Sequence, residues 1–205
     1  MRPCNVILVP RWGGHAESDW YPHVTNRLHS IATVTTLDMP SRSTPEPNAW
    51  LAALAAAMGN AMTSAEAHRG GEPALVGVGH SVGCQTWLRY LSEPSVRSMP
   101  RLAGLLFVAG WWQIDEPWPT LLPWLDHRAF DTSRVMARIA GPIHVVIGAN
   151  DPYTRDAEAN RQEWHARVPA ARITIVEEGK HFNALEEPHV EVALREMIAA
   201  GESIE

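Results

Sequence analysis

One segment of this chain combines a nucleophilic side chain with a spacing that would expose it: Gly79-His80-Ser81-Val82-Gly83. The apolar run 74–78 comes directly before this segment, and a helix-like run, 84–91, comes after it. A G-x-S-x-G motif requires this context, because small residues two positions before and after the serine let a strand and a helix pass closely. We therefore expect the Ser81 hydroxyl to project from a sheet edge as a nucleophile, although the five residues alone would also suit an ordinary loop.

A serine hydroxyl needs a base to take its proton, and the base needs an acid that holds its ring and stabilises its charge. Asp151 follows the apolar run 143–148, and His181 follows the predicted strand 173–176, so each is expected on the loop just past a strand. The chain order Ser, Asp, His is the one expected for a nucleophile on a strand-to-helix turn. The sequence therefore predicts a catalytic triad of Ser81, Asp151 and His181.

Other interpretations of the acid and the histidine stay open at this point. Asp151 stands before a proline, where an aspartate often serves as the N-cap of a helix. His181 lies between Gly179 and Asn183, which would suit an ordinary turn with a solvated histidine. Three rival acids are disfavoured because none of them directly ends a predicted strand: Asp126, Asp131 and Asp156.

Two further histidines are expected to have structural roles. His80 precedes the nucleophile on the strand side of the turn, so its side chain should point away from Ser81 into packing or a pocket wall. His144 lies in the middle of a predicted strand and is expected in the core.

Attack on a carbonyl develops negative charge on its oxygen, which two preorganised N–H donors must stabilise. Val82 is expected to supply one donor, because it follows the nucleophile at a helix N-terminus. The second is expected from the loop after the first strand, from the N–H of Trp12 or else of Arg11. The alternative is that Gly13-Gly14 in this loop forms an ordinary turn.

Tryptophans and prolines concentrate in residues 110–130, which fit neither a helix nor a strand pattern and are predicted to form an insertion or lid. At least one of the four tryptophans in this segment is expected to line an acyl or leaving-group pocket, although packing in the core or lid is the commoner role of tryptophan. Such a pocket favours a neutral hydrophobic substrate. Trp12 and Trp20 would add to the wall. The four candidate pocket residues are Trp111, Trp112, Trp118 and Trp124.

Short β-branched runs alternate with longer helical stretches, which predicts an α/β domain with parallel strands joined by helices. We expect one domain over 1–205, built on a mostly parallel six-stranded sheet flanked by helices on both faces. The predicted strands are 5–10, 33–37, 74–79, 102–108, 143–148 and 173–176. The predicted helices are about 20–30, 48–64 (with Asn48 as its N-cap), 82–91, 153–168 and 189–200.

Composition excludes several classes of function. The chain has 205 residues with 17 Lys and Arg against 23 Asp and Glu, a net charge of −6 that argues against a nucleic-acid partner. Cys4 and Cys84 suggest neither a disulfide framework nor a zinc site, and no metal or other cofactor is expected. The apolar start, 6–10, is too short for a signal peptide or a membrane span, so a cytoplasmic protein is expected.

With the turn, the acid and the histidine in place, the chain resembles the small α/β-hydrolases of the retinoblastoma-binding-protein-nine and YdeN-like serine hydrolase family over nearly its whole length. The resemblance is carried by three segments, namely the Ser81 motif, Asn150-Asp151-Pro152-Tyr153 and Gly179-Lys180-His181-Phe182-Asn183, together with Trp20-Tyr21-Pro22, Leu37-Asp38-Met39-Pro40 and Asn48-Ala49-Trp50. It implies an α/β-hydrolase fold in which Ser81, Asp151 and His181 are nucleophile, acid and base. Relatives commonly carry glycine where this chain has Arg11.

The sequence therefore predicts a serine hydrolase that cleaves ester bonds of a small hydrophobic substrate through an acyl-enzyme, with carboxylesterase activity favoured. Amide or peptide bonds are a close variant, because the same groups cleave both. The alternative is a protein-interaction module that keeps the hydrolase fold with little turnover, since family members resembling this chain include protein-binding factors. A small-molecule ester or amide is the expected partner, and a protein partner stays open.

Overall fold

A single parallel sheet forms the centre of the molecule. The computed structural model describes residues 4–66, 74–96, 101–126 and 130–202. The sheet has six strands in the order β2-β1-β3-β4-β5-β6, and every neighbouring pair is parallel. The strands are β1 (Cys4–Val9), β2 (Thr33–Thr36), β3 (Ala74–His80), β4 (Gly104–Val108), β5 (Ile143–Gly148) and β6 (Ala171–Val176). The predicted six-stranded parallel sheet is thereby confirmed.

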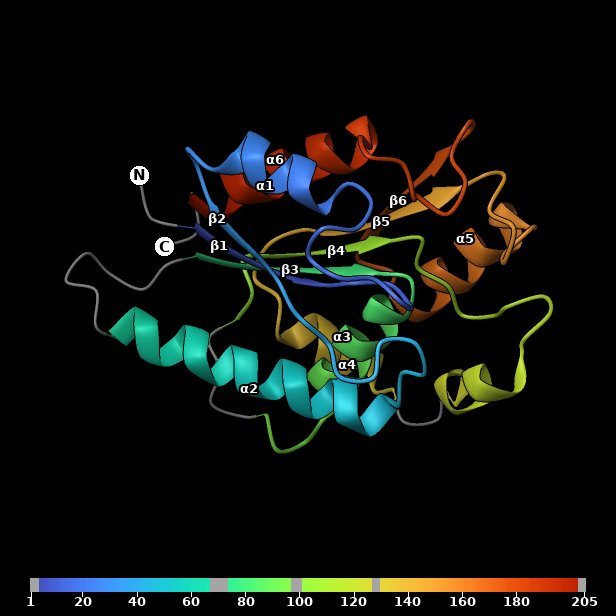
Figure 1. The fold of residues 1–205 in the computed structure, drawn as a ribbon, viewed down its shortest axis with the longest axis horizontal. Helices are drawn as coiled ribbons and strands as arrows, with labels where there is room; N and C mark the ends of the chain where they lie inside the picture. The colour runs from blue at the N-terminus through green and yellow to red at the C-terminus, as the bar shows by residue number, and fades with distance from the viewer. Residues whose placement is uncertain (1–3, 67–73, 97–100, 127–129, 203–205) are drawn as a thin grey trace.

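Helices cover both faces of this sheet, as predicted (Figure 1). Helices α1 and α6 lie on one face, and α2, α3 and α5 pack with the apolar side chains of the other. The helical elements are α1 (Tyr21–Leu28), α2 (Pro47–Glu66), α3 (Val82–Ser92), the 3-10 helix η1 (Pro119–Leu125), α4 (Thr132–Ala137), α5 (Ala157–Arg167) and α6 (Pro188–Glu202).

Alternation along the central strands sends side chains to the two layers in turn. In β1, Ile7 and Val9 belong to the core on the α2 and α3 face, whereas Val6 and Leu8 belong to the core under α1 and α6. Because both faces are buried, β1 from Val6 onward and β3 up to Gly79 are continuously apolar and lack a polar face. This explains why short uninterrupted apolar runs marked the strands in the sequence.

Several predicted boundaries were wrong. Helix α5 begins at Ala157, four residues later than predicted, because Asp156 caps it by accepting a hydrogen bond from the Ala159 N–H at 2.8 Å. Asn48 is no N-cap, since α2 already begins at Pro47, a residue that suits the first helical turn.

Two short helical elements were missed. Residues 119–125 of the predicted irregular segment form η1, and α4 follows it along the chain. Both are one to two turns long, too short to show a hydrophobic periodicity.

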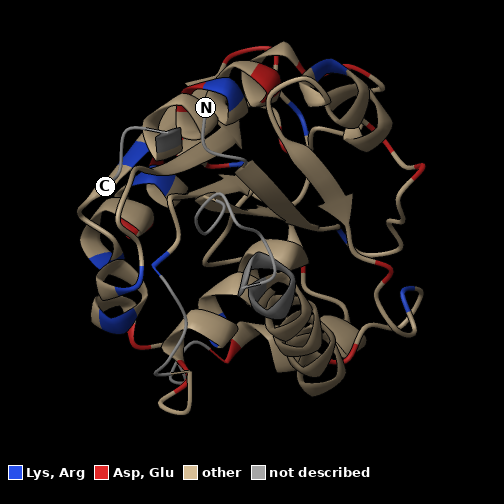
Figure 2. Ribbon diagram, turned by 90° about the vertical axis from the view of Figure 1, so that its left-hand side faces the viewer, with Lys and Arg blue, Asp and Glu red and all other residues tan. Residues whose placement is uncertain are grey.

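Charged residues lie mostly on the outer helices and loops, with Lys and Arg interspersed among Asp and Glu (Figure 2). Ion pairs on helix surfaces include Glu158 with Arg161 and Glu163 with Arg167. Among the helices described, none combines the length and apolar character needed to cross a membrane.

Helix α3 begins unusually close to the end of β1. A Cβ atom added at Gly83 would lie 2.2 Å from the carbonyl oxygen of Val9, a distance that real Cβ atoms do not show. At Gly59, in the middle of α2, an added Cβ would meet nothing within 4 Å. Gly83 and Gly59 therefore make a matched pair for testing how closely α3 packs against β1.

We expect Gly83→Ala to lower the free energy of unfolding by at least about 2 kcal/mol, because helix and strand must separate to admit the methyl group. Gly59→Ala should raise the same free energy by up to about 1 kcal/mol through helix propensity. Denaturant unfolding followed by circular dichroism measures both. Equal midpoints for Gly83→Ala and the parent protein would show that the contact between α3 and β1 is not tight.

Candidate active site

Ser81 occupies a strained turn between β3 and α3. Its backbone has φ 56° and ψ −117°, a conformation that L-residues rarely adopt and that costs of the order of 1–3 kcal/mol. The turn is held from β4, because the Ser81 N–H donates to the carbonyl of Val108 at 2.9 Å. Such a backbone needs support from its surroundings, and it is the geometry expected of an exposed nucleophile.

The two motif glycines have separate steric reasons. A Cβ at Gly79 would lie 2.6 Å from the backbone nitrogen of Cys84, in the first turn of α3. A Cβ at Gly83 would meet the backbone of β1, as described above. Glycine at both positions therefore lets the strand and the helix approach each other around Ser81.

Asp151 and His181 meet beside this turn, on the loops after β5 and β6. The Nδ1 atom of His181 lies 2.7 Å from Oδ2 of Asp151, and both residues are buried. The other carboxylate oxygen accepts a hydrogen bond from the Tyr153 N–H at 2.9 Å, which fixes the orientation of the carboxylate. An ionised carboxylate only accepts, so Nδ1 carries the proton and Nε2 is left as the acceptor of the ring.

The competing roles for the acids can now be assigned. Asp151 caps no helix, so the N-cap alternative was wrong for this residue. Asp156 and Asp131 are instead the N-caps of α5 and α4, accepting hydrogen bonds from backbone N–H groups. His181 is buried at 6% exposure and is therefore no solvated loop histidine.

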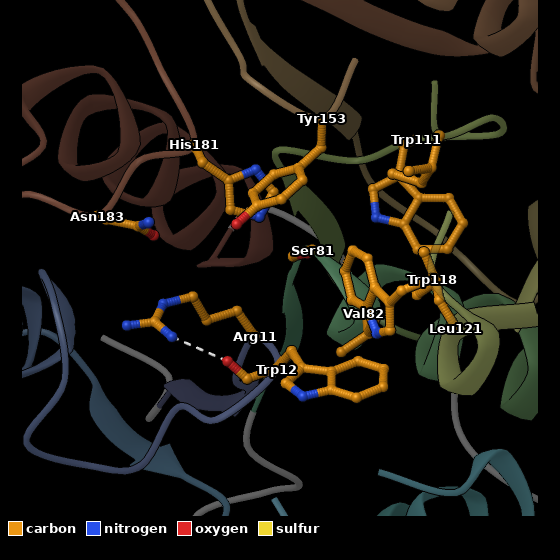
Figure 3. A pocket seen from close by; sticks show the side chains of 11 residues that line it. Arg11, Trp12, Ser81, Val82, Trp111, Trp118, Leu121, Tyr153, His181 and Asn183 are labelled. Carbon is orange, nitrogen blue, oxygen red and sulfur yellow. Dashed lines mark hydrogen bonds between the residues drawn. The ribbon is translucent and has the colours of Figure 1, made fainter. Parts of the chain in front are cut away.

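Ser81 and His181 line one cavity of about 150 Å³ (Figure 3). Arg11 and Asn183 are further polar members of its wall, and the other lining residues are apolar or aromatic. The remaining lining residues are Trp12, Val82, Trp111, Ile114, Trp118, Leu121, Tyr153. Tyr153 and Asn183 each lie two positions after a predicted triad residue, within segments that carry the family resemblance, but neither was predicted to line a cavity.

Only two of the four candidate tryptophans reach the cavity. Trp111 and Trp118 line it, and Trp118 packs edge-on against Trp12 with ring centroids 5.3 Å apart. Trp112 instead packs in the core against Trp164, at 5.1 Å between ring centroids. The predicted pocket role of Trp112 was therefore wrong.

Trp124 and Trp20 are also core residues. Trp124 packs edge-on against Trp50 at 5.6 Å, and its Nε1–H donates to the carbonyl of Pro45 at 3.0 Å. Trp20 is fully buried against Tyr21 on the α1 face of the sheet. Neither side chain lines the cavity, because each is directed into a layer of packed helices.

Hydrogen bonds in the loop after β1 distinguish between its candidate oxyanion donors. The Arg11 N–H donates to the hydroxyl of Tyr21 at 3.1 Å, so this donor is already engaged. The Gly13 and Gly14 N–H groups donate to the carbonyls of Arg42 and Arg11. Within the described part of the chain, the Trp12 N–H has no hydrogen-bond acceptor, and the same is true of Val82 at the start of α3. Trp12 and Val82 are therefore the candidate donors, and Arg11 is not.

The side chain of Arg11 also holds this loop through hydrogen bonds. Its Nε and Nη2 atoms donate to the two carboxylate oxygens of Asp19 at 2.6 and 2.9 Å, and Nη1 donates to the Trp12 carbonyl at 2.8 Å. The hydrogen bond to Asp19 raises the pKa of the guanidinium above its ordinary value. Asp19 itself has φ 51°, so the ion pair also holds a left-handed residue in place.

Comparison with known proteins identifies what this chain is similar to. A family model described as serine hydrolase matches residues 6–191. The structure of the ydeN gene product from B. subtilis is 22% identical, covers 96% of this chain and 99% of its own, and has a TM-score of 0.75. No curated protein matches the sequence significantly.

Two esterase-type structures are similar in fold. The siderophore hydrolase EstB from Aspergillus fumigatus has a TM-score of 0.73 at 13% identity, over 99% of this chain and 92% of its own. Est1E from Butyrivibrio proteoclasticus with ferulic acid bound has a TM-score of 0.68 at 13% identity, over 98% of this chain and 90% of its own. At these identities the likeness establishes the α/β-hydrolase fold.

A double-mutant cycle should detect the Arg11–Asp19 pair as a strong interaction. We expect Arg11→Ala and Asp19→Ala to show a coupling energy of about 1–3 kcal/mol, because the pair is bidentate and partly buried. The exposed pair of Glu158 and Arg161 should give a smaller coupling energy. Urea unfolding of the single and double variants supplies these values. Strictly additive effects of the Arg11 and Asp19 changes would mean that the pair does not hold the loop.

Proposed function

The chain belongs to the serine hydrolase family, and we propose that it hydrolyses esters of small hydrophobic acids through an acyl-enzyme on Ser81. One observation carries the proposal. Ser81, on a strained turn, shares a small cavity with His181, whose Nδ1 lies 2.7 Å from Asp151. The shared cavity and this hydrogen bond support a catalytic triad drawn from the carboxyl ends of β3, β5 and β6.

In the first step, the Ser81 Oγ attacks the ester carbonyl carbon while Nε2 of His181 takes the hydroxyl proton. The ring becomes an imidazolium, and the Asp151 carboxylate stabilises its charge and keeps the proton on Nδ1. The carbonyl π electrons move to oxygen, which gives a tetrahedral intermediate bonded to Ser81.

The N–H groups of Val82 and Trp12 would donate to the oxygen of that intermediate. Val82 is the first residue of α3, so its N–H points away from the helix and adds to the positive end of the helix dipole. Both groups are fixed by the fold before substrate arrives, which is the condition for strong stabilisation of a developing charge.

Collapse of the intermediate breaks the bond to the alcohol, and the imidazolium donates its proton to the leaving oxygen. A water molecule then attacks the acyl-Ser81 ester while Nε2 of His181 takes a proton from the water. The second intermediate releases the carboxylic acid and returns the proton to the Ser81 Oγ. Amide substrates would follow the same steps with an amine leaving group.

Cavity size and lining support short or aromatic acyl esters as the substrate class. About 150 Å³ holds a short or single-ring acyl group, and tryptophan faces suit apolar or aromatic carbon. Est1E, whose fold is similar, binds ferulic acid, so aromatic acyl esters belong among the substrates to test. We propose that residues 111–121, within the predicted insertion at 110–130 of a single domain, form a lid over the acyl group, since four of them line the cavity.

A fluorophosphonate probe should label the native protein and fail to label Ser81→Ala, because the probe reacts with an activated serine. Asp151→Asn should lower kcat for a short p-nitrophenyl ester by about ten-thousandfold, since it removes the charge that orients and stabilises the His181 ring. In-gel fluorescence and an absorbance assay measure the two effects.

Asp156→Asn is the matched control, because asparagine also caps a helix. The probe should label this variant, and the variant should hydrolyse the ester, as with the native protein. Labelling of both native protein and Ser81→Ala, or of neither, would contradict the proposed nucleophile. Equal loss of activity in the two Asp variants would contradict the role of Asp151.

Trp118→Ala should shift the preference among acyl groups toward larger ones, because it removes a ring from the cavity wall. We therefore expect kcat/KM for an aromatic or hexanoyl ester, divided by kcat/KM for an acetyl ester, to rise by at least about tenfold. Leu122→Ala is the control, since this neighbouring side chain is 55% exposed and lies outside the cavity lining. An unchanged ratio in Trp118→Ala would show that residues 111–121 do not determine which acyl groups the protein accepts.

A further inference from the structure

His80 is fully buried, although it carries two polar ring atoms. As the last residue of β3, it points to the same face as Val78, toward α1, and it does not line the cavity. Its Nδ1 lies 2.7 Å from the hydroxyl of Tyr21, and its Nε2 lies 2.8 Å from the backbone carbonyl of His181. The Tyr21 hydroxyl in turn accepts the N–H of Arg11.

Proton positions in this buried hydrogen-bond chain, Arg11–Tyr21–His80–His181, follow from its two ends. A backbone N–H can only donate and a carbonyl can only accept. His80 must therefore carry its proton on Nε2 to reach the His181 carbonyl, which leaves Nδ1 as an acceptor. The Tyr21 hydroxyl then donates to Nδ1 while accepting from Arg11. Each of the two side chains is neutral and has one proton to give.

Burial keeps both groups in these states. Removal from water lowers the pKa of His80 well below its ordinary value, an effect to which the neighbouring His181 adds. Burial likewise raises the pKa of Tyr21. Neither His80 nor Tyr21 is therefore expected to ionise near neutral pH. The donor and the acceptor of each hydrogen bond in the chain then stay the same.

The two ends of this chain of hydrogen bonds belong to the two loops that the proposed mechanism needs. Arg11 directly precedes Trp12, the candidate oxyanion donor. The His181 carbonyl belongs to the peptide before Phe182, a buried residue with φ 53°. A left-handed non-glycine residue needs restraint from its surroundings, and His80 supplies a hydrogen bond to that peptide.

We propose that Tyr21 and His80 are positioning residues, which hold the loop of the oxyanion donor and the loop of the base in a fixed mutual geometry without touching substrate. The proposal rests on the proposed function, in which these two loops carry the oxyanion donor Trp12 and the base His181. It predicts that loss of the Tyr21 hydroxyl impairs catalysis although the variant has intact reactive groups.

Tyr21→Phe tests this with the smallest change, since the ring stays and only the hydroxyl is lost. The Arg11 N–H and the Nδ1 of His80 then have no partner, and the two loops are released from each other. We expect kcat for a short p-nitrophenyl ester to fall about 10- to 100-fold with KM within about twofold, as for a weakened oxyanion site. The rate of fluorophosphonate labelling should fall in parallel.

Tyr90→Phe is the control, because it removes the hydroxyl of another largely buried tyrosine, 6% exposed as a residue, on α3 outside the cavity lining. Its kcat and KM should equal those of the parent. Thermal unfolding of both variants separates general destabilisation from a specific effect on kcat.

Substitutions at His80 provide a rescue series. The amide nitrogen of His80→Gln reaches the position of Nε2 and can still donate to the His181 carbonyl, whereas His80→Ala loses both partners. We expect kcat to decrease in the order native, His80→Gln, His80→Ala, measured at a temperature where each variant is folded. If one His80 variant does not fold, Tyr21→Phe alone decides.

The proposal is overturned if Tyr21→Phe or a folded His80→Ala keeps kcat within twofold of the native protein, or if kcat falls as much in Tyr90→Phe as in Tyr21→Phe. Failure of the proposed function has a different signature, namely that the native protein neither labels nor turns over esters. If the native protein is labelled normally and Tyr21→Phe has an unchanged kcat, the positioning role is rejected and the proposed function stands.

Discussion

The contact of Gly83 with the end of β1 is the constraint on which the rest of the site depends. A Cβ at this position would lie 2.2 Å from the Val9 carbonyl and 2.9 Å from the Pro10 carbonyl, so the start of α3 lies directly against the chain leaving β1. This approach forces the tight turn at Ser81. It also brings Val82, which precedes Gly83, near Trp12, which follows Pro10 by two residues. One steric contact therefore sets the turn that carries Ser81, which is buried at 6% exposure, and brings together the two N–H groups proposed to stabilise the oxyanion.

The sequence predicted the framework of this site well because parallel strands impose a simple rule. The four central strands, β1, β3, β4 and β5, are buried almost throughout and read largely as apolar runs, whereas the edge strands β2 and β6 are only partly buried. All the carboxyl ends meet at one edge. Residues just past such runs must therefore be neighbours in space, whatever the helices between them do. This rule, together with the chain order Ser, Asp, His, predicted Asp151 and His181, and the structure brings their side chains within hydrogen-bond distance.

Side-chain direction outside the sheet could not be predicted in the same way. Trp111 and Trp112 are adjacent in sequence, yet the first lines the cavity and the second packs against Trp164 of α5. Clustered aromatic residues indicate that their side chains are buried. Whether they line a cavity or pack against a helix depends on tertiary packing. The same holds for Tyr21, whose role depends on His80 and Arg11 and has no local sequence signal.

The buried position of His80 shows how strand alternation and polar satisfaction combine. Because β3 alternates, the residue before Ser81 must point into the layer under α1, where a polar ring without partners would cost about 1–3 kcal/mol for each unsatisfied group. Tyr21, the first residue of α1, satisfies one ring nitrogen and the His181 carbonyl satisfies the other. Neither bond can be lost without leaving a buried group unpaired, so docking of α1 and the geometry of both loops are energetically linked. Helix α1 is therefore part of the framework of the site, although neither Tyr21 nor any other residue of it lines the cavity.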